Sequence, residues 1–260
     1  MKVLQFIGTR EKADFALYFA NVLTSLDKRV LIVDTTSTEI YRHGYLHIEE
    51  NETIAEIQNI EVLCGIKNWT DVEKALSKIG EKPTNYDCII IDIYSIEGLL
   101  ASWPIDDRYY LSSNHRLHIT KDIALLNRLF DETNSTTVKR IYFESPFTLR
   151  ADYLEHLMNN RPEWHAFSHT VEYDDFEERL KLQMQHEQII PLKQLSKSIR
   201  KTIESIISLQ FEIELDSVNK VTKTSLFSKL GFKKKQIEVD NYSDSKILSI
   251  SKKSEDVEES

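Results

Sequence analysis

The N-terminal part of the chain alternates between short apolar runs rich in β-branched residues and segments with helical periodicity. Six runs have the length of a strand and are apolar at nearly every position: 2–7, 29–33, 61–64, 88–93, 108–111 and 138–143. Such continuous apolar strands are typical of a sheet that is covered on both faces. The alternation predicts right-handed β-α-β units and a three-layer α/β fold with a mainly parallel sheet.

The pattern becomes mostly helical and acidic after about residue 150. Apolar residues step by three and four from Leu192 to Ile206, and Pro191 before them is a natural helix start. Further on, residues 220–235 hold six lysines and no acid, whereas 239–260 hold six serines and six acids. We therefore expect an α/β domain over 1–215, a basic amphipathic segment over 216–238 and a disordered, flexible acidic tail over 239–260.

Composition excludes several classes of protein. The chain has 33 Lys and Arg against 42 Asp and Glu, a formal net charge of −9, which argues against non-specific nucleic-acid binding. Cys64 and Cys88 offer neither a disulfide framework nor metal-ligand spacing, so we expect a reducing, cytoplasmic setting. No stretch approaches the roughly 20 apolar residues that span a bilayer, and residues 1–8 lack a signal-peptide cleavage site.

The turn after the first predicted strand has the layout of a phosphate-binding loop. In such loops, glycines let backbone N–H groups point at phosphates, a lysine reaches the terminal phosphates, and a Ser or Thr hydroxyl holds Mg²⁺. Here Gly8 forms the turn and a helix opens near Lys12. However, the connection has one glycine, Ala13 has no hydroxyl, and Glu11 and Asp14 place negative charge beside any phosphate.

In order along 1–210, the chain resembles the ParA/MinD class of P-loop ATPases, the SIMIBI class. Lys12 falls at the family's loop lysine, the run ending at Asp34 is similar to its second strand, and 86–92 resembles the Walker B strand that ends in Asp92. The resemblance implies a P-loop NTPase-like fold and a homodimer. If the loop still binds ATP and Mg²⁺, it implies a cofactor site at Gly8, Arg10, Lys12, Asp34 and Asp92.

The loop also departs from the family pattern, which has three glycines and a second lysine. This loop is about two residues shorter, Ala13 stands at the Mg²⁺-binding threonine, and Thr36 stands at the second acid. The departures predict a degenerate loop with no catalytic residues and no cofactor. We expect Lys12 to pair with Asp34 or Asp92 and to fill the phosphate site with a salt bridge.

The histidines do not predict a metal site. His165 and His169 are four residues apart, but no glutamate lies between them and the segment is not convincingly helical. His115 and His118 share this weakness. No Ser/His/Asp or Cys/His arrangement for catalysis is visible in the sequence.

A basic stretch near the C-terminal end resembles the membrane-targeting helix of MinD-like proteins. Apolar anchors and lysines together predict contact with anionic lipid at the inner face of a membrane. The predicted membrane-binding residues are Leu226, Phe227, Lys229, Leu230, Phe232, Lys233, Lys234 and Lys235. Alternatives are a basic linker or a helix that docks on a partner.

Three functions remain open from the sequence. The first is a non-catalytic scaffold or positioning factor that keeps the ATPase fold and serves a partner machinery of pilus, secretion or cell-pole type. The second is an active ATP-dependent switch in localisation or partition, with Lys12 as its cation and Asp92 on Mg²⁺. The third is a DNA-partition factor, against which the net charge counts.

Overall fold

The computed structural model describes residues 1–46, 52–147, 149–150 and 152–223. Contacts along the chain group Met1–Thr224 into one compact unit and Ser225–Ser260 into a second. The predicted membrane-binding residues from Leu226 to Lys235 and the predicted tail over 239–260 lie outside the described residues. None of the described helices is long and apolar enough to cross a membrane.

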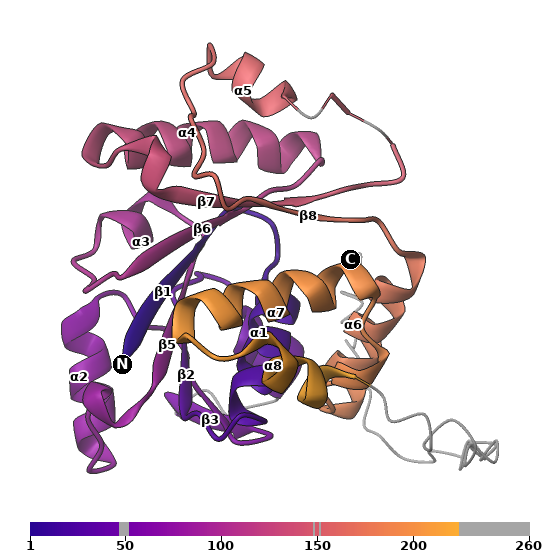
Figure 1. Ribbon diagram of the computed structural model, residues 1–260. Coiled ribbons are helices and arrows are strands. Elements are labelled where there is room, and N and C mark those ends of the chain that lie inside the picture. Colours follow the sequence, from indigo (N-terminus) through magenta and orange to yellow (C-terminus); the bar gives the residue numbers. More distant parts are fainter. Residues whose placement is uncertain (47–51, 148, 151, 224–260) are drawn as a thin grey trace, which may run out of the picture. The chain divides into compact units, whose positions relative to one another are not determined.

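A sheet of eight strands, in the order β3-β4-β2-β5-β1-β6-β7-β8, forms the middle layer of the first unit (Figure 1). The strands are β1 (Lys2–Ile7), β2 (Val30–Asp34), β3 (Ile54–Ile57), β4 (Ile60–Leu63), β5 (Cys88–Ile93), β6 (Asp107–Leu111), β7 (Val138–Phe143) and β8 (His169–Val171). Neighbours pair in parallel, except that β3 runs antiparallel to β4. The mainly parallel sheet is confirmed, and β1 is central.

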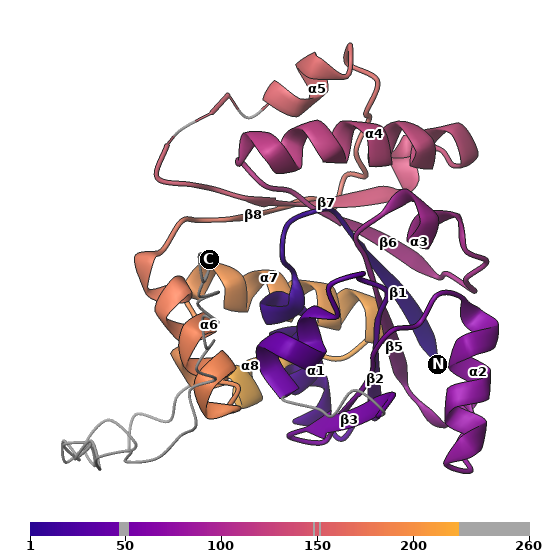
Figure 2. The same ribbon diagram turned by 180° about the vertical axis from the view of Figure 1, so that it is seen from behind.

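Helices cover both faces of this sheet (Figures 1 and 2). One face carries α1 (Ala13–Thr24), α6 (Asp175–Glu187), α7 (Lys197–Phe211) and α8 (Leu215–Thr222). The other face carries α2 (Trp69–Lys78), α3 (Ile96–Leu100), α4 (Arg116–Glu132) and α5 (Tyr153–Leu157). The predicted three-layer α/β fold is therefore confirmed.

Alternation along the strands explains their continuous apolar sequence. In β5, Cys88 and Ile90 belong to the core on the α1 face, whereas Ile89 and Ile91 belong to the core on the α4 face. Because side chains on a strand point alternately to opposite faces, a strand covered on both faces needs apolar residues at every position.

Two parts of the predicted element map differ from the structure. The sequence pattern places a helix start at Pro191, but this residue precedes a short 3₁₀ turn, Leu192–Gln194. The α-helix begins at Lys197, because the side chain of Ser196 accepts a hydrogen bond from the N–H of Ile199 at 3.2 Å and caps it. Strands β3 and β8 are also additions to the predicted set.

The compact unit continues past residue 215, where the sequence pattern places the end of the domain. Helix α8 packs against α7, and Val218 and Thr222 on α8 are fully buried. The hydroxyl of Thr222 also donates to the carboxylate of Glu204 on α7. Residues 216–222 thus belong to the folded core of this unit.

Candidate functional site

The loop from Gly8 to Lys12 leaves the central strand β1 at its carboxyl end and leads into α1. Gly8 has a φ of +142°, and a Cβ atom there would lie 2.6 Å from the carbonyl oxygen of Leu111 at the end of β6. Only glycine fits this backbone. The neighbouring strands β2 and β5 deliver Asp34 and Asp92 to the same edge, because the carboxyl ends of parallel strands lie together.

Lys12 is buried in an ion pair with Asp92, and both side chains are only 1% exposed. Lys12 Nζ lies 2.8 Å from Asp92 Oδ1. The same ammonium donates to the carbonyl of Gly8 at 2.6 Å and to that of Arg10 at 3.4 Å. The ammonium of Lys12 is therefore surrounded by three protein oxygens: two carbonyls that accept from it and the carboxylate of its ion pair. The predicted pairing of Lys12 with Asp92 is confirmed.

Asp92 is held from its other side by Tyr41. The buried hydroxyl of Tyr41 donates to Asp92 Oδ2 at 2.9 Å. Burial, followed by the charge of Asp92, raises the pKa of Tyr41 well above its ordinary value, so the phenol remains a proton donor. Each carboxylate oxygen of Asp92 therefore has a close partner.

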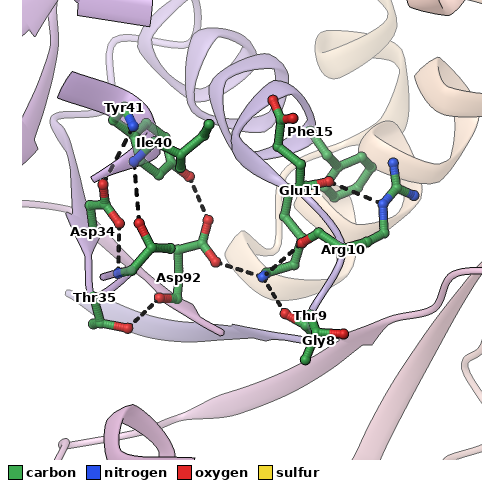
Figure 3. Close-up of polar contacts among 12 residues, drawn as sticks. Gly8, Thr9, Arg10, Glu11, Phe15, Asp34, Thr35, Ile40, Tyr41 and Asp92 are labelled. Atoms are coloured by element: carbon green, nitrogen blue, oxygen red, sulfur yellow. Dashed lines mark hydrogen bonds and ion pairs between the residues drawn. The ribbon is translucent and has the colours of Figure 1, made fainter. Parts of the chain in front are cut away.

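Asp34 does not form the alternative pair with Lys12. Its Oδ1 accepts from the N–H of Thr36 at 2.8 Å, and its Oδ2 accepts a long hydrogen bond from the N–H of Tyr41 at 3.4 Å. Burial raises the pKa of Asp34 to about 6, with a further contribution from the charge of Asp92. The carboxylate organises the turn after β2, as Figure 3 shows.

Asp122 on α4 is a site residue that the sequence reasoning missed. It is fully buried, its Oδ1 accepts from the N–H of Thr9 at 2.7 Å, and its Oδ2 accepts from the hydroxyl of Tyr110 at 2.9 Å. A signal was present, because Asp122 lies three residues after Ile119 on the apolar face of its helix. A carboxylate in such a stripe needs a buried hydrogen-bond partner.

Two further carboxylates of the loop and helix start are also engaged. Asp14 Oδ1 accepts from the N–H of Phe15 at 2.7 Å, in the first turn of α1. Glu11 accepts from the hydroxyl of Tyr45 at 2.7 Å and pairs with Lys181 of α6 at 3.0 Å. The loop is thus fastened to α6 and to the π-helical turn Arg42–Leu46.

Arg10 lies apart from the other predicted cofactor residues. Its guanidinium carbon lies 3.7 Å from the centre of the Phe143 ring, and its Nε donates to the carbonyl of Glu11 at 3.1 Å. Figure 3 shows Arg10 extending away from Asp92. The structure therefore gathers Gly8, Lys12, Asp34 and Asp92 but not the charge of Arg10.

A cavity of about 260 Å³ adjoins the ion pair and includes Lys12, Thr36, Asp92 and Tyr94 in its lining. The donors expected for a triphosphate are already engaged there: the ammonium of Lys12 by Asp92 and the N–H of Thr9 by Asp122. Ala13 stands where the family's hydroxyl would hold Mg²⁺. These residues, as arranged, do not fit a magnesium nucleotide.

Of the two histidine pairs in the sequence, only His118 reaches this site, where it lines the cavity beside Lys12 and Asp92. His169 belongs to strand β8 and His165 lies in the loop before it, so they share no helix. His118 Nδ1 lies 3.2 Å from the hydroxyl of Thr9. Within the described residues, no group of three or more His, Cys, Asp or Glu side chains is arranged to hold a metal ion.

No protein-family model matches the chain, and no curated protein matches it in sequence. Solved structures do match. The MinC:MinD cell division protein complex of Aquifex aeolicus aligns with a TM-score of 0.56 at 13% identity, covering 80% of this chain and 96% of that chain. A ParA family ATPase from Chlorobium tepidum aligns with a TM-score of 0.54 at 14% identity, covering 81% and 98%.

The MinD cell division protein of Aquifex aeolicus aligns with a TM-score of 0.51 at 12% identity, covering 80% of this chain and 98% of that chain. Each alignment spans nearly all of the other chain, although few residues are identical. The chain therefore has a ParA/MinD-like P-loop fold, as the resemblance of its sequence implies.

Proposed function

We propose that this chain, which has the ParA/MinD-like P-loop fold, is a pseudo-ATPase that acts as a scaffold or positioning factor for a partner machinery. The buried ion pair between Lys12 and Asp92 carries the proposal, because it occupies the lysine that a P-loop uses for phosphate. The similar structures include a cell division protein bound to MinC and a ParA family ATPase. A role in localisation or partition is proposed by analogy with them.

Electrostatics supports a site closed to nucleotide. A triphosphate would have to draw Lys12 away from Asp92, and an unpaired carboxylate buried in this way costs about 3–5 kcal/mol. Asp34 and Asp122 are also buried at this edge of the sheet. Their charges oppose a further anion, whereas an active P-loop presents uncommitted N–H groups to it.

The alternative function is an active ATP-dependent switch in localisation or partition. The cavity beside Lys12 and Asp92 favours it, because both residues line this space. A nucleotide would reach Lys12 there once the lysine leaves Asp92. Phosphate release from Mg²⁺-ATP separates the two functions. We expect the full chain and its Lys12→Ala variant to show the same background rate. Turnover that disappears in Lys12→Ala would establish the switch instead.

A homodimer is proposed from the resemblance, with Arg10 and Lys12 near its interface. If no nucleotide holds the two copies together, the dimer forms without one. Light scattering should then give the mass of a dimer with and without ATP. A monomer that dimerises only when ATP is added would contradict both the proposed dimer and the pseudo-ATPase.

Peripheral membrane binding is proposed from the sequence of 225–235, which is outside the described residues. Leu226, Phe227 and Leu230 are the apolar anchors, and each nearby lysine contributes about 1 kcal/mol at an anionic surface. The full chain should sediment with vesicles of anionic lipid, and removal of residues 224–260 should abolish this. Equal sedimentation of both chains would reject membrane binding through this segment.

A further inference from the structure

A second cavity, of about 390 Å³, lies at the same edge of the sheet and shares Arg10, Glu11 and His118 with the lining of the first. It is lined by the start of α1, by the segments that follow β6, β7 and β8, and by α6. Within the described part of the chain, its lining contains seven carboxylate side chains but only one arginine, Arg10, and one lysine, Lys181. We call this cavity the acidic cleft.

The cations of the acidic cleft do not neutralise its acids. Lys181 is paired with Glu11 at 3.0 Å, and Arg10 is stacked on Phe143. In contrast, Glu144, Glu172 and Glu178 are exposed, and among the described residues their side chains form neither an ion pair nor a hydrogen bond. The cleft thus keeps a surplus of negative charge that faces solvent.

Glu177, which lines the acidic cleft, and Tyr18, in the hydrophobic core, each have a buried polar atom without a hydrogen bond within the described residues. Glu177 accepts from the N–H of Ser196 at 2.7 Å with one oxygen, but its Oε2 is buried without a hydrogen bond within the described residues. The hydroxyl of Tyr18, 1% exposed, also lacks a partner there. Burial, followed by the charges of Asp14, Glu177 and Glu178, raises the pKa of Tyr18.

Unsatisfied buried polar atoms are uncommon in folded proteins and call for a partner. Burial also raises the pKa of both Asp14 and Glu177. A cationic group that entered the cleft would supply a counter-charge to both Asp14 and Glu177. Both needs point to the same chemistry of ligand, an ammonium or guanidinium group.

Exposed apolar side chains belong to the segments that line the acidic cleft. Tyr173 lines it and is 47% exposed. Leu117, next to the lining residue His118, is 63% exposed, and Phe147, next to the lining residue Pro146, is 74% exposed. Large apolar side chains that are exposed together on a surface are characteristic of protein interaction sites.

We propose that the acidic cleft docks a basic, partly apolar segment of a partner protein. One lysine or arginine of the segment reaches Glu177 and Asp14, further cations face Glu144, Glu172 and Glu178, and apolar residues lie on Leu117, Phe147 and Tyr173. The inference rests on the proposed scaffold function and names the chemistry of its partner. Charge complementarity selects this occupant, and the exposed apolar side chains distinguish it from a free polyamine.

Fluorescence anisotropy with the full chain and a labelled peptide of alternating lysine and leucine tests the proposal. At physiological ionic strength we expect saturable binding. The triple variant Glu144→Gln, Glu172→Gln, Glu178→Gln should weaken it by about tenfold or more. The matched control Glu56→Gln, Glu73→Gln, Glu163→Gln removes the same charge away from the cleft and should change it by less than about twofold. Circular dichroism checks that both variants fold.

Two further measurements distinguish a basic, partly apolar peptide from a purely cationic ligand. Leu117→Ser with Phe147→Ser should weaken the lysine-leucine peptide but not an oligolysine peptide. The proposal would be overturned if the peptide did not bind, or if both triple variants lost the same affinity. It would also be overturned if the variant Leu117→Ser, Phe147→Ser kept its affinity for the lysine-leucine peptide, or if spermine at equal concentration displaced that peptide. ATP binding is measured in a separate experiment. If the chain binds both the peptide and ATP, the pseudo-ATPase proposal is rejected and the docking proposal stands.

Discussion

Lys12 and Asp92 form a buried ion pair that engages the lysine of the loop after β1. Each side chain has little access to water, so the charge of each is compensated by the other and not by solvent. Removing one partner leaves the other charged and unpaired, which is costly, whereas replacing both with apolar residues can be nearly neutral. The contribution of the pair is therefore best measured by changing both residues.

Replacing Lys12 with alanine should lower the free energy of unfolding by about 3 kcal/mol, because it leaves Asp92 unpaired. The double variant Lys12→Met, Asp92→Leu should recover most of that loss. Urea denaturation measures both. Lys181→Ala serves as the control, since its more exposed pair with Glu11 should cost only about 1 kcal/mol. A loss in Lys12→Ala no larger than in the control would show that the pair is dispensable.

Asp34 should make stability depend on pH. Its pKa is about 6 in the folded protein against an ordinary value of 3.8, so the folded state holds this proton more tightly. The resulting stability is fully present below the unfolded pKa and is lost as pH rises through about 6. Across this range the free energy of unfolding of the wild type should fall by on the order of 2–3 kcal/mol. The Asp34→Asn variant should not show this fall, because its amide does not titrate.

Urea denaturation at pH values on either side of this window measures the difference. Asp216→Asn, an exposed aspartate on α8, is the control and should follow the wild type. Parallel pH profiles for Asp34→Asn and the wild type would contradict the assignment.

The sequence identifies some of these residues and not others for a physical reason. Gly8, Lys12, Asp34 and Asp92 follow or end apolar strands, so the carboxyl edge of a parallel sheet brings them together. Asp122 lies 113 residues from Thr9, and Tyr41 lies 51 residues from Asp92. Such contacts depend on how α4 and the turn after β2 pack, which local periodicity does not specify.

At the level of elements, β1 and β6 approach closely where the loop begins, and Gly8 permits it. Gly8→Ala should lower the free energy of unfolding by at least about 3 kcal/mol, because of its φ and the clash with the carbonyl of Leu111. Gly80→Ala is the control, since Gly80 also has a positive φ but nothing within 4 Å of the added atom.

The control should cost only about 1 kcal/mol, the strain of the backbone alone. Thermal and urea unfolding of the two variants give the comparison. Equal losses at Gly8 and Gly80 would show that the close approach to β6 does not matter.

Secondary-structure elements could be predicted from the sequence where both of their faces are buried. The six strands covered on both faces have continuous apolar sequences and were found by pattern. Strands β3 and β8 form the two edges of the sheet, and most of their residues are not fully buried, so they lack the continuous apolar sequence of the inner strands. The start of α7 was misplaced because the apolar stripe runs through the 3₁₀ turn before Ser196.

For the molecule as a whole, α8 sets where the folded unit can be cut. Ending the chain at residue 214 removes Val218 and Thr222, which are buried against α7, and should cost about 3 kcal/mol. Ending it at residue 224 keeps both and should leave the free energy of unfolding unchanged. Urea denaturation of the two truncated chains tests this, and equal stability of the two would contradict a structural role for α8.

The fold and the loop chemistry follow from different parts of the sequence. Apolar periodicity specifies the three layers, and solved structures at 12–14% identity share them. The loop depends on a few side chains, and those present favour internal pairing. We therefore propose that this chain keeps the shared framework while Lys12 and the N–H of Thr9 are engaged by carboxylates.

Isothermal titration of Mg²⁺-ATP into the full chain tests that claim most directly. We predict no saturable heat up to millimolar ATP, because Lys12 and the N–H of Thr9 are engaged by Asp92 and Asp122. Stoichiometric binding with a micromolar dissociation constant that is lost in Lys12→Ala would contradict it.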